Sequence, residues 1–217
     1  MAISRRVGSN TGHYALLCLL CRPVSKVSHV SSSQPAPARR PSLRDDMVAS
    51  TLTLARTGAS ISLESAARAA GVTKAGLMYH FPTKQALMTA VIDHLMDQYE
   101  NELAARLSDE HPTSAVTCSR LGAYLDWVCD GHFDHGDLVM FTDPRLREPL
   151  SARWNERMGE WVHIPEALPA HERARLHAVR LITDGIWFNA ASNGIPLTDQ
   201  DRDAVQALAH QLLQEKS

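Results

Sequence analysis

Residues 61–84, with the sequence ISLESAARAAGVTKAGLMYHFPTK, decide the fold of this chain. Two short helices are expected here, one starting after Ser62 and one after Thr73, because both residue types are favoured N-caps. Gly71 between them adopts the positive-φ backbone of a tight inter-helix turn without steric cost. Pro82 stops the second helix, since the residue before a proline disfavours helical geometry. The segment therefore predicts a helix-turn-helix.

The second short helix has two different faces. Val72, Leu77 and Phe81 are expected to anchor it to a core. The opposite face is small, basic and aromatic, and consists of Lys74, Ala75, Gly76, Tyr79 and His80. Such a face suits a helix that enters the major groove of DNA.

Helical patterns continue on both sides of this segment. Upstream, Ser42 is expected to cap a helix that ends at Gly58. Downstream, a long helix starts at Thr83, and its apolar residues recur every four positions: Leu87, Val91, Leu95, Tyr99, Leu103 and Leu107. Further helices are expected over residues 114–131, 136–142, 144–162, 169–192 and 198–215. We found no sustained strand-like alternation after residue 41, so the pattern predicts an all-α protein.

The chain divides into three parts by pattern. Residues 42–95 form the expected helix-turn-helix DNA-binding domain, joined by the long helix to a second helical part over residues 96–217. Residues 1–41 are expected to be a disordered or mis-assigned leader, rich in Ser, Pro and Ala towards its end. A signal peptide is the alternative, but a mostly polar stretch separates the apolar run from a cleavage-like Ala36-Pro37-Ala38. That run, Tyr14 to Cys21, is too short for a membrane span, which needs about twenty residues.

Charge is unevenly distributed along the chain. The 217 residues contain 22 Lys plus Arg and 24 Asp plus Glu, for a net charge of −2. Residues 1–38 carry +4, residues 39–95 carry +3 and residues 96–217 carry −9. This asymmetry indicates a front part that meets a polyanion and a rear part that does not. The 44% apolar and 21% charged residues exclude a mostly disordered chain.

The ordered motif from Gly71 to Lys84 resembles the hallmark of the tetracycline-repressor (TetR) family of transcriptional regulators. The cap, the turn glycine, Tyr-His-Phe, Pro and Lys occur in the family's order, and the likeness extends from Ser42 to Leu95. The rear part resembles the family's variable C-terminal domain in length and helix count, which implies a regulatory ligand-binding and dimerisation domain over residues 96–217. Two positions depart from the pattern: Gly76 stands where Ser or Thr is common, and Met78 stands where an aromatic residue is common.

The resemblance implies which residues meet double-stranded operator DNA. From the recognition helix these are Thr73, Lys74, Ala75, Gly76, Tyr79 and His80. Lys84 and Ser62, each at the start of a helix, are expected to hold phosphates. Arg39, Arg40 and Arg44 precede or begin the first helix and form either an arm on the DNA or a merely solvated basic linker.

The resemblance also implies a homodimer with a small-molecule effector. Dimerisation is expected through apolar faces on the last two helices, made of Leu176, Val179, Ile182 and Ile186, and of Val205, Leu208 and Leu212; the alternative is packing within one chain. The expected effector pocket contains Trp127, Met140, Phe141, Trp154, Asp184, Trp187 and Phe188, which alternatively are ordinary core residues. Asp184 is the candidate for orienting a polar or cationic group.

The sequence thus predicts a cytoplasmic, non-enzymatic, DNA-binding regulator, and a repressor released from its operator by a small molecule. The alternative is a DNA-binding regulator without such an effector. A metal-dependent enzyme is a remote alternative, because His132-Phe133-Asp134-His135 lacks a clear third ligand and no nucleotide or hydrolase motif is present. No cofactor and no metal are expected.

Gly76 provides a first test. Replacing Gly76 with Ser restores the hydroxyl that is common at this position, so we expect operator preference to change while the fold is kept. Selection from a randomised operator library measures this preference. Identical preferences for Gly76→Ser and the parent protein would contradict the prediction.

Overall fold

The computed structural model describes residues 42–107 and 115–215. Within these ranges every regular element is a helix, so the all-α prediction is confirmed. The elements are α1 (Leu43–Arg56), α2 (Leu63–Ala69), α3 (Lys74–His80), α4 (Lys84–Ala104), α5 (Thr117–Asp130), the 3₁₀ helix η1 (His135–Phe141), α6 (Arg147–Val162), α7 (Ala170–Ala191) and α8 (Asp199–Gln214). The expected leader and its Arg39 and Arg40 lie outside the described residues.

The first four helices begin at the predicted caps. The hydroxyls of Ser42, Ser62, Thr73 and Thr83 each accept a hydrogen bond from the backbone N–H three residues later, at 3.0–3.2 Å. Gly71 has a φ of 67°, as the tight turn requires. The segment expected as a helix over 136–142 is a 3₁₀ helix, which begins with a capping box between Asp134 and Asp137.

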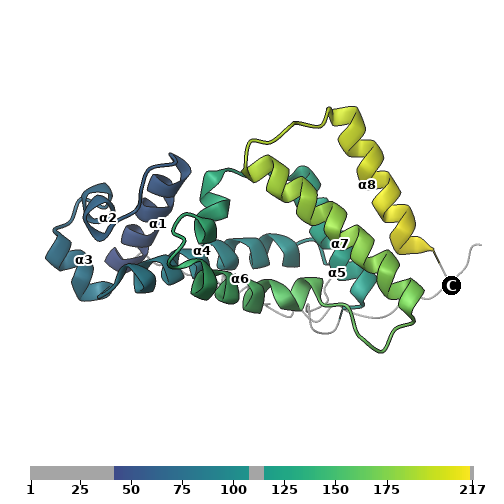
Figure 1. The fold of residues 1–217 in the computed structure, drawn as a ribbon, viewed down its shortest axis with the longest axis horizontal. Helices are drawn as coiled ribbons and strands as arrows, with labels where there is room; N and C mark the ends of the chain where they lie inside the picture. The colour runs from purple at the N-terminus through teal and green to yellow at the C-terminus, as the bar shows by residue number, and fades with distance from the viewer. Residues whose placement is uncertain (1–41, 108–114, 216–217) are drawn as a thin grey trace, which may run out of the picture. The chain divides into compact units, whose positions relative to one another are not determined.

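Helix α4 belongs to both halves of the described chain. Figure 1 shows α1, α2 and α3 around its first turns, and α5, α6 and α7 near its second half. The predicted apolar stripe, Leu87, Val91, Leu95, Tyr99, Leu103 and Leu107, is entirely buried. It lies in one continuous core, together with Leu77 and Phe81 of the helix-turn-helix and with Trp127 and Trp161 of the rear part. The helix crosses the expected boundary at residue 95 without a break.

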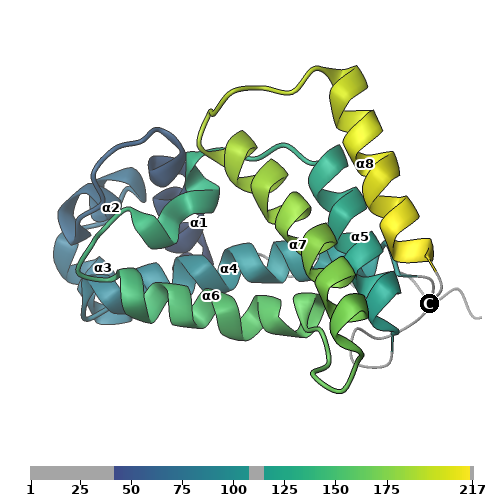
Figure 2. The same ribbon diagram turned by 45° about the vertical axis from the view of Figure 1, so that its right-hand side comes forward.

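Ion pairs join α4 to α6, which runs beside it in Figures 1 and 2. The guanidinium of Arg157 donates to Glu100 at 2.6 and 2.7 Å and to Asp97 at 2.8 Å. Arg153 donates to Asp93 at 2.7 Å. Glu156 and Asp93 raise the pKa of Arg153, and Glu100 and Asp97 raise that of Arg157, so both guanidinium groups stay charged. A forked network of this kind restricts sliding of α4 along α6 more than an isolated surface pair would.

Helices α5, α7 and α8 enclose a second, smaller core. It contains Leu121, Leu125, Leu176, Val179, Ala209 and Leu213. Leu176 and Val179, which we expected in a dimer interface, are therefore fully buried inside their own chain. Their apolar face packs on α5 and α8, so the alternative of packing within one chain applies to these two residues.

Among the described residues, no helix combines the length and apolar character needed to cross a membrane.

Candidate DNA-binding surface and effector cavity

Helix α3 presents its polar face to solvent because its apolar face is anchored. Leu77 and Phe81 are buried. Tyr79 on the opposite side is 84% exposed, the most of any aromatic side chain in the described chain. Its ring meets His80 edge to face, with centroids 5.2 Å apart. Lys74 is also exposed, so the outward face predicted from the sequence is the one observed.

Gly76 faces outward next to the cap of α3. A Cβ atom built at this position would lie 3.2 Å from Oγ1 of Thr73, the atom that accepts the Gly76 N–H. A side chain here therefore requires the cap to shift by a few tenths of an ångström. Ala75 is exposed next to Gly76, so no large side chain projects from the centre of this face, and another molecule can approach the helix backbone closely.

The expected phosphate-binding residues lie in different surroundings. Ser62 is exposed, but its hydroxyl already caps α2 and contacts Ser65. Arg44 is exposed, with its guanidinium carbon 4.8 Å from the centre of the Phe81 ring. That contact ties the start of α1 to the end of α3.

Lys84 is joined to the rear part of the chain. Its Nζ donates to Oδ2 of Asp143 at 2.6 Å, across 59 residues of sequence. The Lys84 ammonium holds the pKa of Asp143 below its usual range, so the carboxylate stays ionised. The sequence gives no local signal for this contact, because the two partners are 59 residues apart.

A cavity of about 310 Å³ lies between α5, η1, α6 and α7. Its walls are formed by Tyr124, Met140, Phe141, Ser151, Trp154, Asn155, Met158, Val162, Arg180, Asp184, Trp187 and Phe188. Six of the seven residues expected in the effector pocket are in this set. Trp127 is not, because it is buried in the main core, where its Nε1 donates to Glu102 at 2.6 Å.

The cavity is mostly apolar: five of its twelve lining residues are aromatic, and Arg180 and Asp184 form a polar corner. The rings of Trp154 and Trp187 lie 5.3 Å apart at 36°. In the corner, the Tyr124 hydroxyl donates to Asp184 at 2.9 Å, and Arg180 Nε lies 3.8 Å from the same carboxylate. Burial and the neighbouring Asp184 raise the pKa of Tyr124, so the phenol remains a donor. Asp184 is thus already partnered, and a cationic group would compete with Arg180 for it.

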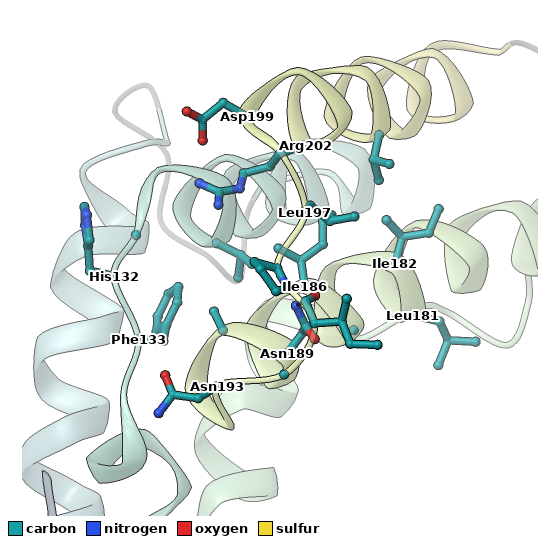
Figure 3. Close-up of a pocket in the computed structure, with 18 residues that line it drawn as sticks. His132, Phe133, Leu181, Ile182, Ile186, Asn189, Asn193, Leu197, Asp199 and Arg202 are labelled. Carbon is teal, nitrogen blue, oxygen red and sulfur yellow. Dashed lines mark hydrogen bonds between the residues drawn. The ribbon is translucent and has the colours of Figure 1, made fainter. Parts of the chain in front are cut away.

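A second, larger cavity of about 910 Å³ opens between α7, α8 and residues 131–133. Figure 3 shows Ile182 and Ile186 of α7 facing Leu197 and Arg202 across it. Val205 of α8 also lines this space. In Figure 2 the first turns of α8 stand away from α7, whereas its last turns approach the rest of the rear part. The cavity therefore lies on the side where these two helices diverge.

The segment His132-Phe133-Asp134-His135, considered above as a remote candidate for a metal site, contributes to local structure instead. Asp134 accepts the Gly136 N–H at 2.7 Å and pairs with Arg56 at 3.4 Å. Across residues 42–107 and 115–215, no group of three His, Cys, Asp or Glu side chains is placed to hold a metal ion.

Two family models match the chain, and together they cover more than half of it. The model described as "Bacterial regulatory proteins, tetR family" matches residues 54–91. The model described as "Tetracyclin repressor-like, C-terminal domain" matches residues 119–214. No curated protein matches the chain significantly.

Solved structures share the fold. A TetR-family member from Streptomyces coelicolor A3 is 19% identical, with a TM-score of 0.54 over 79% of this chain and 98% of that one. The multidrug binding protein EbrR in complex with imidazole is 18% identical, with a TM-score of 0.52 over 82% of this chain and 98% of that one.

The helix-turn-helix, the long connecting helix and the helical rear part define a DNA-binding transcriptional regulator. The chain belongs to the TetR family. Membership in this family points to a non-enzymatic transcription factor.

Proposed function

We propose that this regulator is a cytoplasmic repressor that binds its operator as a homodimer and leaves it when a small molecule enters the 310 Å³ cavity. One observation carries the proposal: the cavity and the DNA-binding helices share a single continuous core along α4. A change in packing around the cavity therefore has a direct mechanical path to α3.

The DNA contacts proposed from the recognition helix are supported by exposure and charge. Tyr79 and Lys74 stand free of the core, and the low surface at Ala75 and Gly76 allows close approach to base edges. The net charge of +3 over residues 39–95 favours a polyanion, while the −9 of residues 96–217 keeps the rear part away from it.

Dimerisation is supported by apolar side chains left uncovered on α7, on α8 and in the connection between them. Leu181, Ile195 and Leu208 are 59%, 88% and 51% exposed. Ile182, Ile186 and Val205, expected in the interface, line the 910 Å³ cavity between the helices, and Leu212 is half-buried nearby. A second copy that inserts its own α7 or α8 here would cover this surface and pair two recognition helices on one operator.

The effector is proposed to be a compact and largely apolar or aromatic molecule. Trp154, Trp187, Phe141 and Phe188 supply flat walls, and the volume admits a small ligand only. The Nε1 of Trp187 is buried and has no hydrogen-bond partner among the described residues. A rotation of this ring on binding would offer the donor to an acceptor on the effector.

Substitution of Tyr79 tests the DNA surface. Tyr79→Ala should weaken operator binding by about 1–3 kcal/mol, the usual worth of a base contact, or roughly five- to 150-fold. The melting temperature should stay unchanged because the side chain contacts little of the core. Fluorescence anisotropy with a labelled duplex from the chain's own upstream promoter measures the affinity. Val116→Ala, an exposed apolar truncation on α5's N-cap, is the control and should bind like the parent protein.

A charge on α8 tests the dimer. Leu208→Glu places a carboxylate in the proposed interface, so we expect monomers in analytical ultracentrifugation and a large loss of operator affinity. Ala207→Glu adds the same charge to a neighbouring exposed position on the helix and should remain dimeric. If Leu208→Glu stays dimeric, the interface lies elsewhere.

A compound screen tests effector gating. Compounds that reduce operator affinity and change tryptophan emission should lose about ten-fold in potency in Phe188→Ala, because one aromatic wall is removed. Ile195→Ala, which lines the other cavity, should leave their potency unchanged. If no compound from a broad aromatic library affects DNA binding, the chain is a regulator without a small-molecule effector.

A further inference from the structure

The ion pair between Lys84 and Asp143 joins the start of α4 to the turn between η1 and α6. Their side chains are 31% and 20% exposed, so the pair is partly shielded from water. A second pair, Arg56 with Asp134, lies at the other end of η1, and the Tyr99 hydroxyl donates to Asp137 in its middle. The short element η1 is thereby attached at three points to α1 and α4.

The same element forms part of the cavity wall. Met140 and Phe141, its last two residues, line the 310 Å³ cavity, and Asp143 follows two positions later. The turn between them is internally bonded: the Thr142 hydroxyl donates to the Val139 carbonyl at 2.8 Å, and Asp143 Oδ1 accepts the Arg145 N–H at 3.0 Å. Because Phe141 and Asp143 share this internally bonded turn, a displacement of the backbone at Phe141 moves the Asp143 carboxylate as well.

Asp143 also occupies the place where Lys84 would bind an anion. A phosphate at hydrogen-bond distance from Lys84 Nζ would stand within a few ångströms of a carboxylate of the same sign. The repulsion between two such charges is large at this separation, even in a partly solvated site. DNA and Asp143 are therefore alternative partners for Lys84.

We propose that Asp143 competes with an operator phosphate for Lys84, and that the cavity wall sets the outcome of this competition through Phe141. The inference rests on the proposed function and on the phosphate contact that the family resemblance implies for Lys84. An effector that holds the turn in its present position keeps Lys84 paired with Asp143 and lowers DNA affinity. By linkage, bound DNA lowers the affinity for such an effector by the same factor.

The first experiment is a salt titration of DNA binding by Asp143→Asn. The asparagine keeps an oxygen that can accept the Arg145 N–H, but it no longer holds the ammonium by charge. We expect three- to ten-fold tighter binding at 0.15 M salt. Because each of the two Lys84 side chains in the dimer then neutralises one more phosphate, the slope of log affinity against log salt should steepen by about 1.8.

Asp130→Asn is the matched control. Asp130 is an exposed carboxylate at the end of α5 that pairs with Arg106 at 3.6 Å. Its replacement with asparagine removes one negative charge, as Asp143→Asn does. Equal effects of the two substitutions would overturn the proposal, because they would reflect net charge alone.

Two double-variant cycles locate the effect. In a Lys84→Gln background, Asp143→Asn should give no gain, and a persisting gain would overturn the competition. Phe141→Ala should change DNA affinity in the parent protein but not in Asp143→Asn, and additive effects or no effect in either background would overturn the link to the cavity.

If the parent protein itself binds DNA without dependence on salt or on Tyr79, the proposed function fails, which these cycles distinguish from failure of the competition.

Discussion

The shared helix α4 is the constraint on which the rest of the structure depends. Its first half closes the core of the helix-turn-helix, and its second half is enclosed by α5, η1 and α6. Because one apolar stripe from Leu87 to Leu103 is buried along its length, neither half can repack without affecting the other. The ion pairs of Arg153 and Arg157 to α4 add a fixed register with α6. Helix α4 thus couples the position of the helix-turn-helix to the packing of the rear part.

Attachment through η1 gives the DNA-binding helices a second link to the rear part. The buried Tyr99–Asp137 contact holds the middle of this element against α4, and burial raises the pKa of both groups, so the Tyr99 phenol keeps its proton and remains the donor. The charged pairs at its two ends are more exposed, and these contacts are easier to open than the buried one. An element such as η1, with a buried contact in its middle and more exposed ion pairs at its ends, is suited to switching between two positions.

The helix-turn-helix was predictable because its signals are local. Caps at Ser62 and Thr73, the positive φ of Gly71 and the break at Pro82 act within a few residues, and all are found as expected. The cavity residues were largely predictable too, since aromatic residues on separate helices tend to meet. The residues predicted wrongly have one cause in common: an apolar pattern in the sequence does not specify which surface that face packs against. Trp127 therefore faces the main core, and Leu176 and Val179 face α5 and α8.

By itself, the sequence determined that the chain is helical, where the first four helices begin, the outward face of α3 and the division of charge, because each depends on residues close together along the chain. Only the tertiary structure decided which apolar faces are covered and which stay open, as at Ile195 and Leu208. It also decided that Lys84 meets Asp143, a contact across 59 residues. The physical reason is that burial and ion pairing depend on distance in space, whereas caps, turns and periodicity depend on distance along the chain.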